Sequence, residues 1–172
     1  MVQAPDHTSA DRLDRMVQLY EKDLLRLCCL YLRDRNTAED IVQETFLKAY
    51  RNMDSFRGES NEKTWLTRIA VNCCRDYRRS AWYRYIDRRV TVDSLPLSSA
   101  SSPGDDHVAL TLAIMKLRPK YLEVVLLYFY EGYPIKDVAK MLDITEAAVS
   151  VRLRNAKEQL KAELEGGEGD ER

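Results

Sequence analysis

The sequence predicts an all-α protein made of two small helical domains joined by a flexible linker. Apolar residues recur every three or four positions over most of the chain, and no run alternates in the way that a half-buried β-strand requires. Glycines and prolines number only 6 and 5 in 172 residues, and 32% of the residues are charged. This composition favours helices. The exception is the segment of residues 91–107, which is rich in Ser, Pro and Asp and separates two helical parts.

The first domain is expected over residues 1–90 and contains three amphipathic helices. The first helix is predicted over residues 11–32. The second is predicted to start at Thr37, whose side chain caps the first turn, and the third near Lys63. The predicted buried faces consist of Leu13, Val17, Tyr20, Leu24, Leu27 and Tyr31 in the first helix, Val42, Phe46, Ala49 and Tyr50 in the second, and Trp65, Ile69, Cys73 and Tyr77 in the third.

The second domain is expected over residues 108–164. Pro119 and Pro134 are placed at helix starts, where a missing amide proton costs nothing, and Gly132 ends the helix between them. Residues 91–107 are predicted to be the linker and residues 165–172 a disordered tail. The four predicted helices of this domain cover residues 108–117, 120–130, 134–142 and 145–164.

Residues 135–154 have the pattern of a helix-turn-helix. The turn carries Asp143 where glycine is usual, which is acceptable because aspartate enters the left-handed region more readily than most residues. Apolar or small residues fall where the sharp angle between the two helices requires them, at Val138, Ala139, Leu142, Ile144 and Val149.

The outward face of the second of these helices fits a reader of the DNA major groove. Its small residues permit close approach, and arginine can bond a guanine bidentately. Arg152 and Lys157 flank this face and suit contacts with phosphates. A solvated surface helix in an ordinary bundle remains the alternative. The outward residues are Ala147, Ser150, Val151, Arg154, Asn155 and Glu158.

A concentrated basic segment lies within a nearly neutral chain. The formal net charge is −1, yet residues 63–89 contain 8 basic and 2 acidic residues. One polar stripe at helical spacing suits a phosphate backbone, and it consists of Arg68, Asn72, Arg75 and Arg79. The aromatic residues that follow either bind unstacked bases or close the small core, and they are Trp82, Tyr83 and Tyr85.

Catalytic and membrane classes are not indicated. Asp40 and Glu44 stand one turn apart, but no third ligand completes a metal site. The four cysteines form two adjacent pairs, whose members point about 100° apart on a helix, so we expect them to be reduced and half-buried. No apolar run reaches the roughly 20 residues of a membrane span, and the N-terminus lacks a signal-peptide pattern. We therefore expect a cytoplasmic protein without a cofactor, a metal, membrane insertion or a small-molecule substrate.

Three segments, in this order, resemble a known family. They are AEDIVQETFLKAY at residues 38–50, SFRGESNEKTWLTRIAVNCCRDYRR at residues 55–79, and LRPKYLEVVLLYFYEGYPIKDVAKMLDITEAAVSVRLRNAKEQL after the linker. Together they resemble the bacterial extracytoplasmic function sigma factors, compact members of the sigma-70 superfamily that retain only regions 2 and 4. The stretches DIVQETF and TWLTRIAVN are more specific signals than the helix-turn-helix alone.

The resemblance implies a promoter-specificity subunit that is not an enzyme. Its first domain would bind the clamp helices of the β′ subunit of core RNA polymerase and open the minus-ten element of promoter DNA. Its second domain would bind the β flap and read the minus-thirty-five element. Such subunits are typically held inactive by an anti-sigma factor. The implied core-binding residues are Asp40, Gln43, Glu44 and Lys48.

The implied minus-ten residues begin in a loop that captures a flipped base of the non-template strand and continue along the next helix. They are Phe56, Arg57, Gly58, Glu59, Ser60, Lys63, Arg68, Asn72, Arg75 and Arg79. The implied minus-thirty-five residues are Ala147, Ser150, Val151, Arg152, Arg154, Asn155 and Lys157. Many relatives have Gly and Lys where this chain has Ala147 and Ser150, so the recognition helix departs from the family pattern.

The alternative function is a stand-alone helix-turn-helix regulator, which binds a specific duplex by itself and often as a dimer on a palindrome. Two observations disfavour it: the most basic segment lies in the other domain, and no ligand-sized pocket is indicated. The two hypotheses differ in whether DNA selectivity requires polymerase.

Overall fold

The computed structural model describes residues 8–58, 60–80 and 105–167. Within these residues the secondary structure is helical and contains no β-strand, so the predicted all-α class is confirmed. The chain divides into two compact units, Met1–Val90 and Thr91–Arg172. The division falls at the start of the predicted linker, most of which lies outside the described residues.

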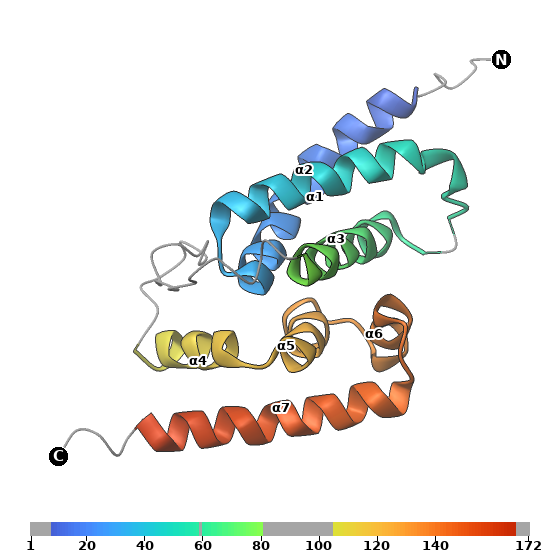
Figure 1. The fold of residues 1–172 in the computed structure, drawn as a ribbon. Coiled ribbons are helices and arrows are strands. Elements are labelled where there is room, and N and C mark those ends of the chain that lie inside the picture. Colours follow the sequence, from blue (N-terminus) through green and yellow to red (C-terminus); the bar gives the residue numbers. More distant parts are fainter. Residues whose placement is uncertain (1–7, 59, 81–104, 168–172) are drawn as a thin grey trace. The chain divides into compact units, whose positions relative to one another are not determined.

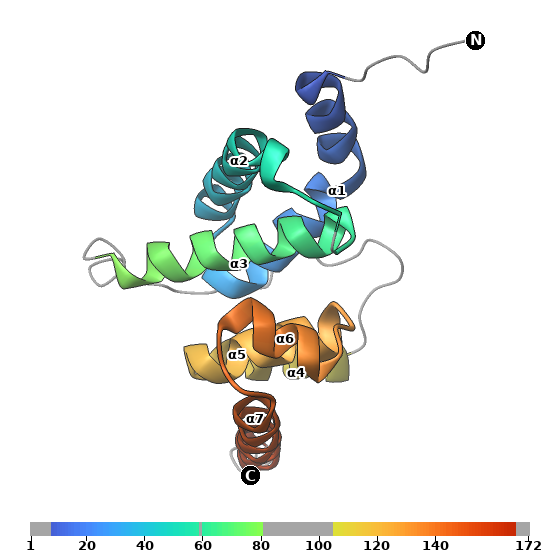
Figure 2. The same ribbon diagram turned by 90° about the vertical axis from the view of Figure 1, so that its right-hand side faces the viewer.

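Three long helices form the first unit. They are α1 (Ser9–Leu32), α2 (Arg35–Arg51) and α3 (Glu62–Arg79), and a short 3-10 turn, η1 (Met53–Ser55), follows α2. Each helix packs against the other two (Figures 1 and 2). Mutual packing leaves every helix with one buried side and one outward side.

Side-chain caps fix where these helices begin. At α3 the Asn61 side chain accepts a hydrogen bond from the backbone N–H of Thr64 at 2.7 Å. At α2 the cap is Asp34, whose carboxylate accepts from the backbone N–H of Thr37 at 2.8 Å. The prediction that Thr37 caps this helix was wrong, because Asp34 stands three residues earlier and takes the amide of Thr37 itself.

The buried face of α3 is rotated relative to the prediction. Trp65, Ile69 and Tyr77 are only half-buried, whereas Cys73 is buried as expected. The cause is that α3 packs against two helices, so its buried side is wider than a single i, i+4 row. The buried residues of α3 are Leu66, Thr67, Ala70, Val71, Cys73 and Cys74.

In α2 the predicted stripe is confirmed at Val42, Phe46 and Ala49, but Tyr50 is 46% exposed. The interior side of α2 instead includes Thr45, whose hydroxyl donates to the carbonyl of Ile41 at 2.7 Å and so stays satisfied in the core. The predicted face of α1 is buried towards its C-terminal end, at Leu24, Leu27 and Tyr31, and half-buried towards its N-terminal end, at Leu13, Val17 and Tyr20.

All four cysteines are free and fully buried, rather than half-buried as expected. Cys28 of α1 and Cys74 of α3 meet across the helix interface, with sulfur atoms 3.7 Å apart. Burial raises the pKa of Cys29 to about 11, and it also raises the pKa values of Cys73 and Cys74. Cys29, Cys73 and Cys74 therefore act in the core as small neutral groups.

The second unit contains four α-helices within the described residues. They are α4 (Asp105–Lys116), α5 (Pro119–Val125), α6 (Ile135–Leu142) and α7 (Glu146–Gly167), and α5 continues into a π-helical turn, η4 (Leu126–Tyr130). The long helix α7 lies along one side of the unit and packs against the other three (Figure 1).

The helices predicted for this unit are confirmed with shifted ends. Because α4 begins at Asp105, residues 105–107 of the predicted linker are helical. Because α7 reaches Gly167, residues 165–167 of the predicted tail are helical too. The other residues of the linker and tail lie outside the described residues. Pro119 begins α5 and Pro134 caps α6, as predicted.

The turn between α6 and α7 agrees with the helix-turn-helix prediction. Asp143 ends α6 in the left-handed conformation, with φ 55° and ψ 50°. The positions predicted to be apolar plugs are buried at Val138, Ala139, Leu142 and Val149, and half-buried at Ile144. Among the described residues, no helix has the length and apolar character needed to cross a membrane.

The raised pKa of Cys29 predicts a loss of stability at alkaline pH. The unfolded thiol ionises near its ordinary value of 9.0 and the folded thiol near 11, so the unfolded state loses its proton first. The stabilisation is complete below pH 9 and is lost as the pH rises towards 11. We expect the free energy of unfolding to fall by about 2 kcal/mol more in the wild type than in Cys29→Ala over this range, measured by urea titration. Equal declines in the two proteins would contradict this assignment.

Candidate nucleic-acid interface

The polar stripe predicted on α3 lies on the outward side of that helix. Arg68, Asn72 and Arg79 are exposed and Arg75 is half-buried. Arg78 lies off the stripe, and its guanidinium carbon is 5.0 Å from the centre of the Tyr31 ring. Basic residues of α3 are therefore divided between an outward row and a contact with the core.

A hollow lies beside the start of this stripe, and we call it the α3 hollow. Its volume is about 370 Å³, and one wall is an aromatic pair, Phe56 and Trp65, with ring centres 4.8 Å apart and planes inclined by 37°. Gly58, in the adjoining loop, has a φ of +73°, a conformation that a residue with a Cβ adopts only under strain. The residues that line the α3 hollow are Ser55, Phe56, Arg57, Ser60, Trp65 and Arg68.

Aromatic faces next to guanidinium groups are the chemistry that proteins use to hold unstacked bases. The structure thus brings together Phe56, Arg57 and Ser60 from the predicted loop with Arg68 from the predicted stripe. Trp65 also lines the hollow, although the sequence assigned it to the core; its position one turn before Ile69 gave no sign of this. Glu59 lies outside the described residues.

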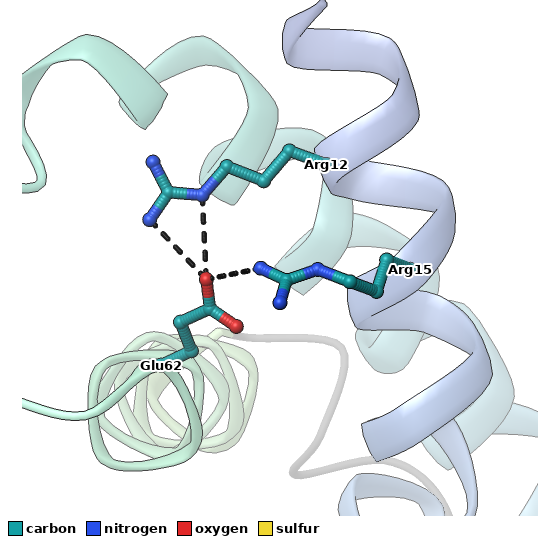
Figure 3. Close-up of polar contacts among 3 residues, drawn as sticks. All are labelled: Arg12, Arg15 and Glu62. Carbon is teal, nitrogen blue, oxygen red and sulfur yellow. Dashed lines mark hydrogen bonds and ion pairs between the residues drawn. The ribbon is translucent and has the colours of Figure 1, made fainter. Parts of the chain in front are cut away.

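An ion-pair cluster ties α1 to the first turn of α3 (Figure 3). One carboxylate oxygen of Glu62 accepts hydrogen bonds from Nε and Nη2 of Arg12, both at 3.3 Å, and from Nη2 of Arg15 at 2.6 Å. The predicted DNA-binding residue Lys63 forms a second ion pair between α3 and α1, with its ammonium 3.1 Å from a carboxylate oxygen of Asp23. Sequence spacing gave no signal for these contacts, because the partners are about 40 to 50 residues apart.

The predicted core-binding residues share the outward side of α2. Asp40, Gln43 and Glu44 are exposed, and Lys48 is half-buried. Lys48 pairs with Glu44 at 2.8 Å, and this hydrogen bond raises the pKa of the Lys48 ammonium. The outward side of α2 therefore displays a mixed array of carboxylates, amide and ammonium.

An apolar groove runs between α1 and α2 next to this array, and we call it the α1–α2 groove. Its volume is about 570 Å³, and Leu47 on its edge is 55% exposed. The sequence prediction missed this groove because it treated Leu13 and Val17 as core and did not consider Leu47. The residues that line it are Leu13, Val17, Glu21, Leu25, Glu39, Val42, Gln43, Phe46 and Leu47.

In the second unit, α7 divides into the two sides predicted for a recognition helix. The outward residues Ala147, Ser150, Val151 and Arg154 are exposed, and Asn155 is half-buried. The inward residues Val149, Leu153 and Ala156 are buried, and Leu160 is half-buried. The small outward residues leave the backbone of α7 accessible to a groove of DNA.

The two flanking cations of α7 already have partners within the protein. Nη1 of Arg152 lies 2.8 Å from a carboxylate oxygen of Glu123, a residue of α5 that is only 5% exposed. The ammonium of Lys157 lies 5.4 Å from the centre of the Phe129 ring. Arg152 therefore joins α7 to α5 through an ion pair within the protein. In the described parts of the chain, no three His, Cys, Asp or Glu residues are grouped as a metal site would require.

Comparison with known proteins identifies the class to which these features belong. Residues 16–84 match the family Sigma-70 region 2, and residues 107–160 match the family Sigma-70, region 4. The first match contains the α3 hollow and the outward side of α2, and the second contains the helix-turn-helix. The chain is thus a protein of the sigma-70 class.

Curated relatives show to which group of sigma-70 proteins the chain belongs. The chain is 31% identical over 167 residues to the ECF RNA polymerase sigma factor SigW of Bacillus subtilis, covering 90% of this chain and 89% of the relative. It is 30% identical over 162 residues to SigM of the same organism, covering 92% and 99%, and 30% identical over 156 residues to SigM of Mycobacterium tuberculosis, covering 90% and 79%. The chain belongs to the extracytoplasmic function (ECF) RNA polymerase sigma factors, as the sequence motifs predicted, and is not a stand-alone regulator.

Solved structures share the fold. The sigma factor RpoE of Bartonella quintana, in complex with the anti-sigma factor NepR, superposes with a TM-score of 0.72 at 23% identity and covers 90% of this chain and 97% of its own. CnrH, in complex with the cytosolic domain of CnrY, gives a TM-score of 0.65 at 22% identity, covering 90% and 88%. These likenesses confirm the architecture of two helical domains.

The buried pair between Glu123 and Arg152 predicts a specific weakness of the second unit. Glu123→Gln leaves the partly buried guanidinium without its counter-charge, so we expect the free energy of unfolding to fall by about 2 kcal/mol. The control is Glu163→Gln in α7, the helix that also contains Arg152. It removes an exposed ion pair with Lys116 of α4 and should lower the free energy of unfolding by no more than about 0.5 kcal/mol. Chemical denaturation of both variants measures the difference, and equal losses would contradict the structural role of Glu123.

Proposed function

We propose that this ECF sigma factor binds core RNA polymerase, directs it to promoters through two separate DNA contacts, and opens the minus-ten element by capturing one base. The observation that carries the proposal is the α3 hollow, which places an aromatic wall and two arginines at the start of an outward basic stripe. The protein itself catalyses no reaction and acts in the cytoplasm, where polymerase and chromosomal DNA meet.

Core polymerase binds the outward side of α2 through Asp40, Gln43, Glu44 and Lys48. The clamp helices of the β′ subunit are the partner that this mixed charged array suits, since exposed charges of both signs confer orientation and specificity more than affinity. The adjacent α1–α2 groove supplies apolar surface, which carries most of the affinity in interfaces. The half-buried Leu13 and Val17 support this arrangement, because they are apolar and the described residues of their unit cover them incompletely.

The minus-ten element is opened by the loop of residues 56–60 together with α3. A base flipped from the non-template strand enters the α3 hollow against Phe56 and Trp65, while Arg68, Asn72, Arg75 and Arg79 follow the phosphate backbone. Extruding a base costs a few kcal/mol, and stacking in the hollow offsets that cost. Lys63 supports the site from its ion pair with Asp23.

The minus-thirty-five element is read by α7. Ala147, Ser150 and Val151 face the base edges at close range, while Arg154 and Asn155 supply hydrogen bonds. Arg152 and Lys157 contact phosphates at the borders of this face, and Glu123 holds the first of these in place. The β flap of polymerase binds the same domain. Each of the two proposed domains, residues 1–90 and 108–164, therefore makes one contact with polymerase and one with DNA.

An anti-sigma factor controls the protein by covering the α1–α2 groove and the recognition helix. The support comes from the structurally similar sigma factor of Bartonella quintana, which was solved with the anti-sigma factor NepR, and from the solved complex of CnrH with CnrY. Residues 91–104 serve as the linker between the two domains that such a partner covers.

The proposed function predicts promoter-dependent transcription. Purified protein added to core polymerase should produce transcripts with discrete start sites on genomic templates, and core polymerase alone should not. Mapping the transcript ends measures this and yields the promoter consensus. If no promoter-dependent transcripts form, or if the protein binds a specific duplex equally well without polymerase, the proposal is wrong.

The two surfaces of the first unit should respond differently to substitution. We expect Asn72→Ala and Arg75→Ala to reduce open-complex formation about three- to tenfold with unchanged affinity for core polymerase, because the proposal assigns them to DNA and not to the polymerase surface. We expect Asp40→Ala and Gln43→Ala to weaken core binding. Lys22→Ala is the control for lost positive charge and Glu165→Ala for lost negative charge, as both residues are exposed and neither belongs to the surfaces assigned here. Equal loss of both activities in every variant would indicate a folding defect and contradict the separation.

A further inference from the structure

The N-terminal part of α1 contacts the α3 hollow through a chain of side chains. Arg12 takes part in two contacts at once: its Nε and Nη2 atoms donate to Glu62, and its guanidinium carbon lies 5.1 Å from the centre of the Phe56 ring. Phe56 in turn packs on Trp65 at 4.8 Å. A guanidinium can bond a carboxylate along its edge while an aromatic ring packs on its face, so the two contacts of Arg12 are compatible.

Glu62 is the residue through which α3 receives these contacts. It is the first residue of α3, where a carboxylate is favoured by the helix dipole, and its side chain is only 18% exposed. Partial burial makes the charge costly without a cation, and Arg12 and Arg15 both supply one (Figure 3). Trp65 and Arg68 follow Glu62 within the first two turns of α3, so fixing the start of α3 fixes two residues of the hollow.

Arg12 and Arg15 also lie outside the part of the chain that matches the region 2 family. That match begins at residue 16, whereas a capping box formed by Thr8 and Asp11 starts α1 directly before Arg12. The capping box keeps this first turn helical and therefore holds Arg12 at a fixed height along α1. Arg12, which contacts Glu62 and Phe56 beside the hollow, thus precedes the matched region.

We propose that Arg12 and Glu62 are positioning residues for base capture: they hold Phe56 and Trp65 in place before DNA arrives. This inference rests on the proposed function of the α3 hollow. A wall that is already ordered spares the captured base the entropic cost of ordering it, so capture and strand opening are faster. Arg15 shares the carboxylate of Glu62 without contacting Phe56, and its contribution to opening is smaller.

The test uses the full-length protein reconstituted with core polymerase on a promoter taken from its own start-site map. Three quantities are measured for each variant: affinity for core polymerase, the equilibrium constant of the closed complex, and the rate constant of isomerisation to the open complex. We expect Arg12→Ala to lower the isomerisation rate roughly five- to tenfold and to change the other two quantities less than twofold. Arg15→Ala, the matched control, should lower the rate only about twofold. Arg12→Lys retains a cation over Phe56 and should recover part of the rate.

The outcomes distinguish this inference from the function on which it rests. If Phe56→Ala slows isomerisation while Arg12→Ala does not, the positioning role is wrong and the hollow remains a capture site. If neither Phe56→Ala nor Arg57→Ala slows isomerisation, the proposed capture site itself is wrong. A parallel loss of core affinity and thermal stability in Arg12→Ala would show that Arg12 acts only on folding and would overturn the inference. A rate for Arg12→Lys no higher than that of Arg12→Ala would show that a cation over Phe56 does not support the hollow, and it would overturn the inference too.

Discussion

The packing of α3 against both α1 and α2 is the constraint on which the rest of the first unit depends. It buries a wide side of α3, including Leu66, Ala70 and Cys74, and so commits the opposite side to the row that contains Arg68 and Asn72. The hollow forms where this helix starts, since Trp65 lies at the edge of the buried side and meets Phe56 from the loop.

Ion pairs between elements then set how firmly each proposed DNA-binding surface is held. In the first unit Glu62 joins α3 to two arginines of α1, and in the second Glu123 joins α5 to Arg152 of α7. Both carboxylates are largely buried, and both pairs connect residues far apart in the sequence. Each helix with a proposed DNA-binding surface is therefore held by a partner outside that surface. The apolar α1–α2 groove is left incompletely covered by the described residues of its own unit.

Local sequence signals predicted the elements and the outward faces, and they failed where two elements meet. Periodicity located the helices, and the tolerance of aspartate for positive φ explains the turn at Asp143. Periodicity predicted Tyr50 and Trp65 to be buried, but Tyr50 is exposed and Trp65 is half-buried. The pattern of one helix does not reveal how many other helices pack against it. It also gave no sign of Arg12 contacting Phe56 or of Arg152 contacting Glu123, since contacts between residues so far apart in the sequence depend on tertiary packing. The outward positions on α7 were predictable because the periodicity of that helix alone shows which of its sides faces away from the core.

Photocrosslinking of promoter DNA tests the central claim, capture of a base in the α3 hollow, most directly. A photoreactive base is placed in turn at each non-template position of the minus-ten element, and the crosslinked peptide of the sigma factor is identified by mass spectrometry in the open complex. The account predicts one position with strong crosslinks to residues 55–68, which disappear in the closed complex. Crosslinks spread evenly over the element, or confined to peptides of α7 or of the outward side of α2, would contradict it.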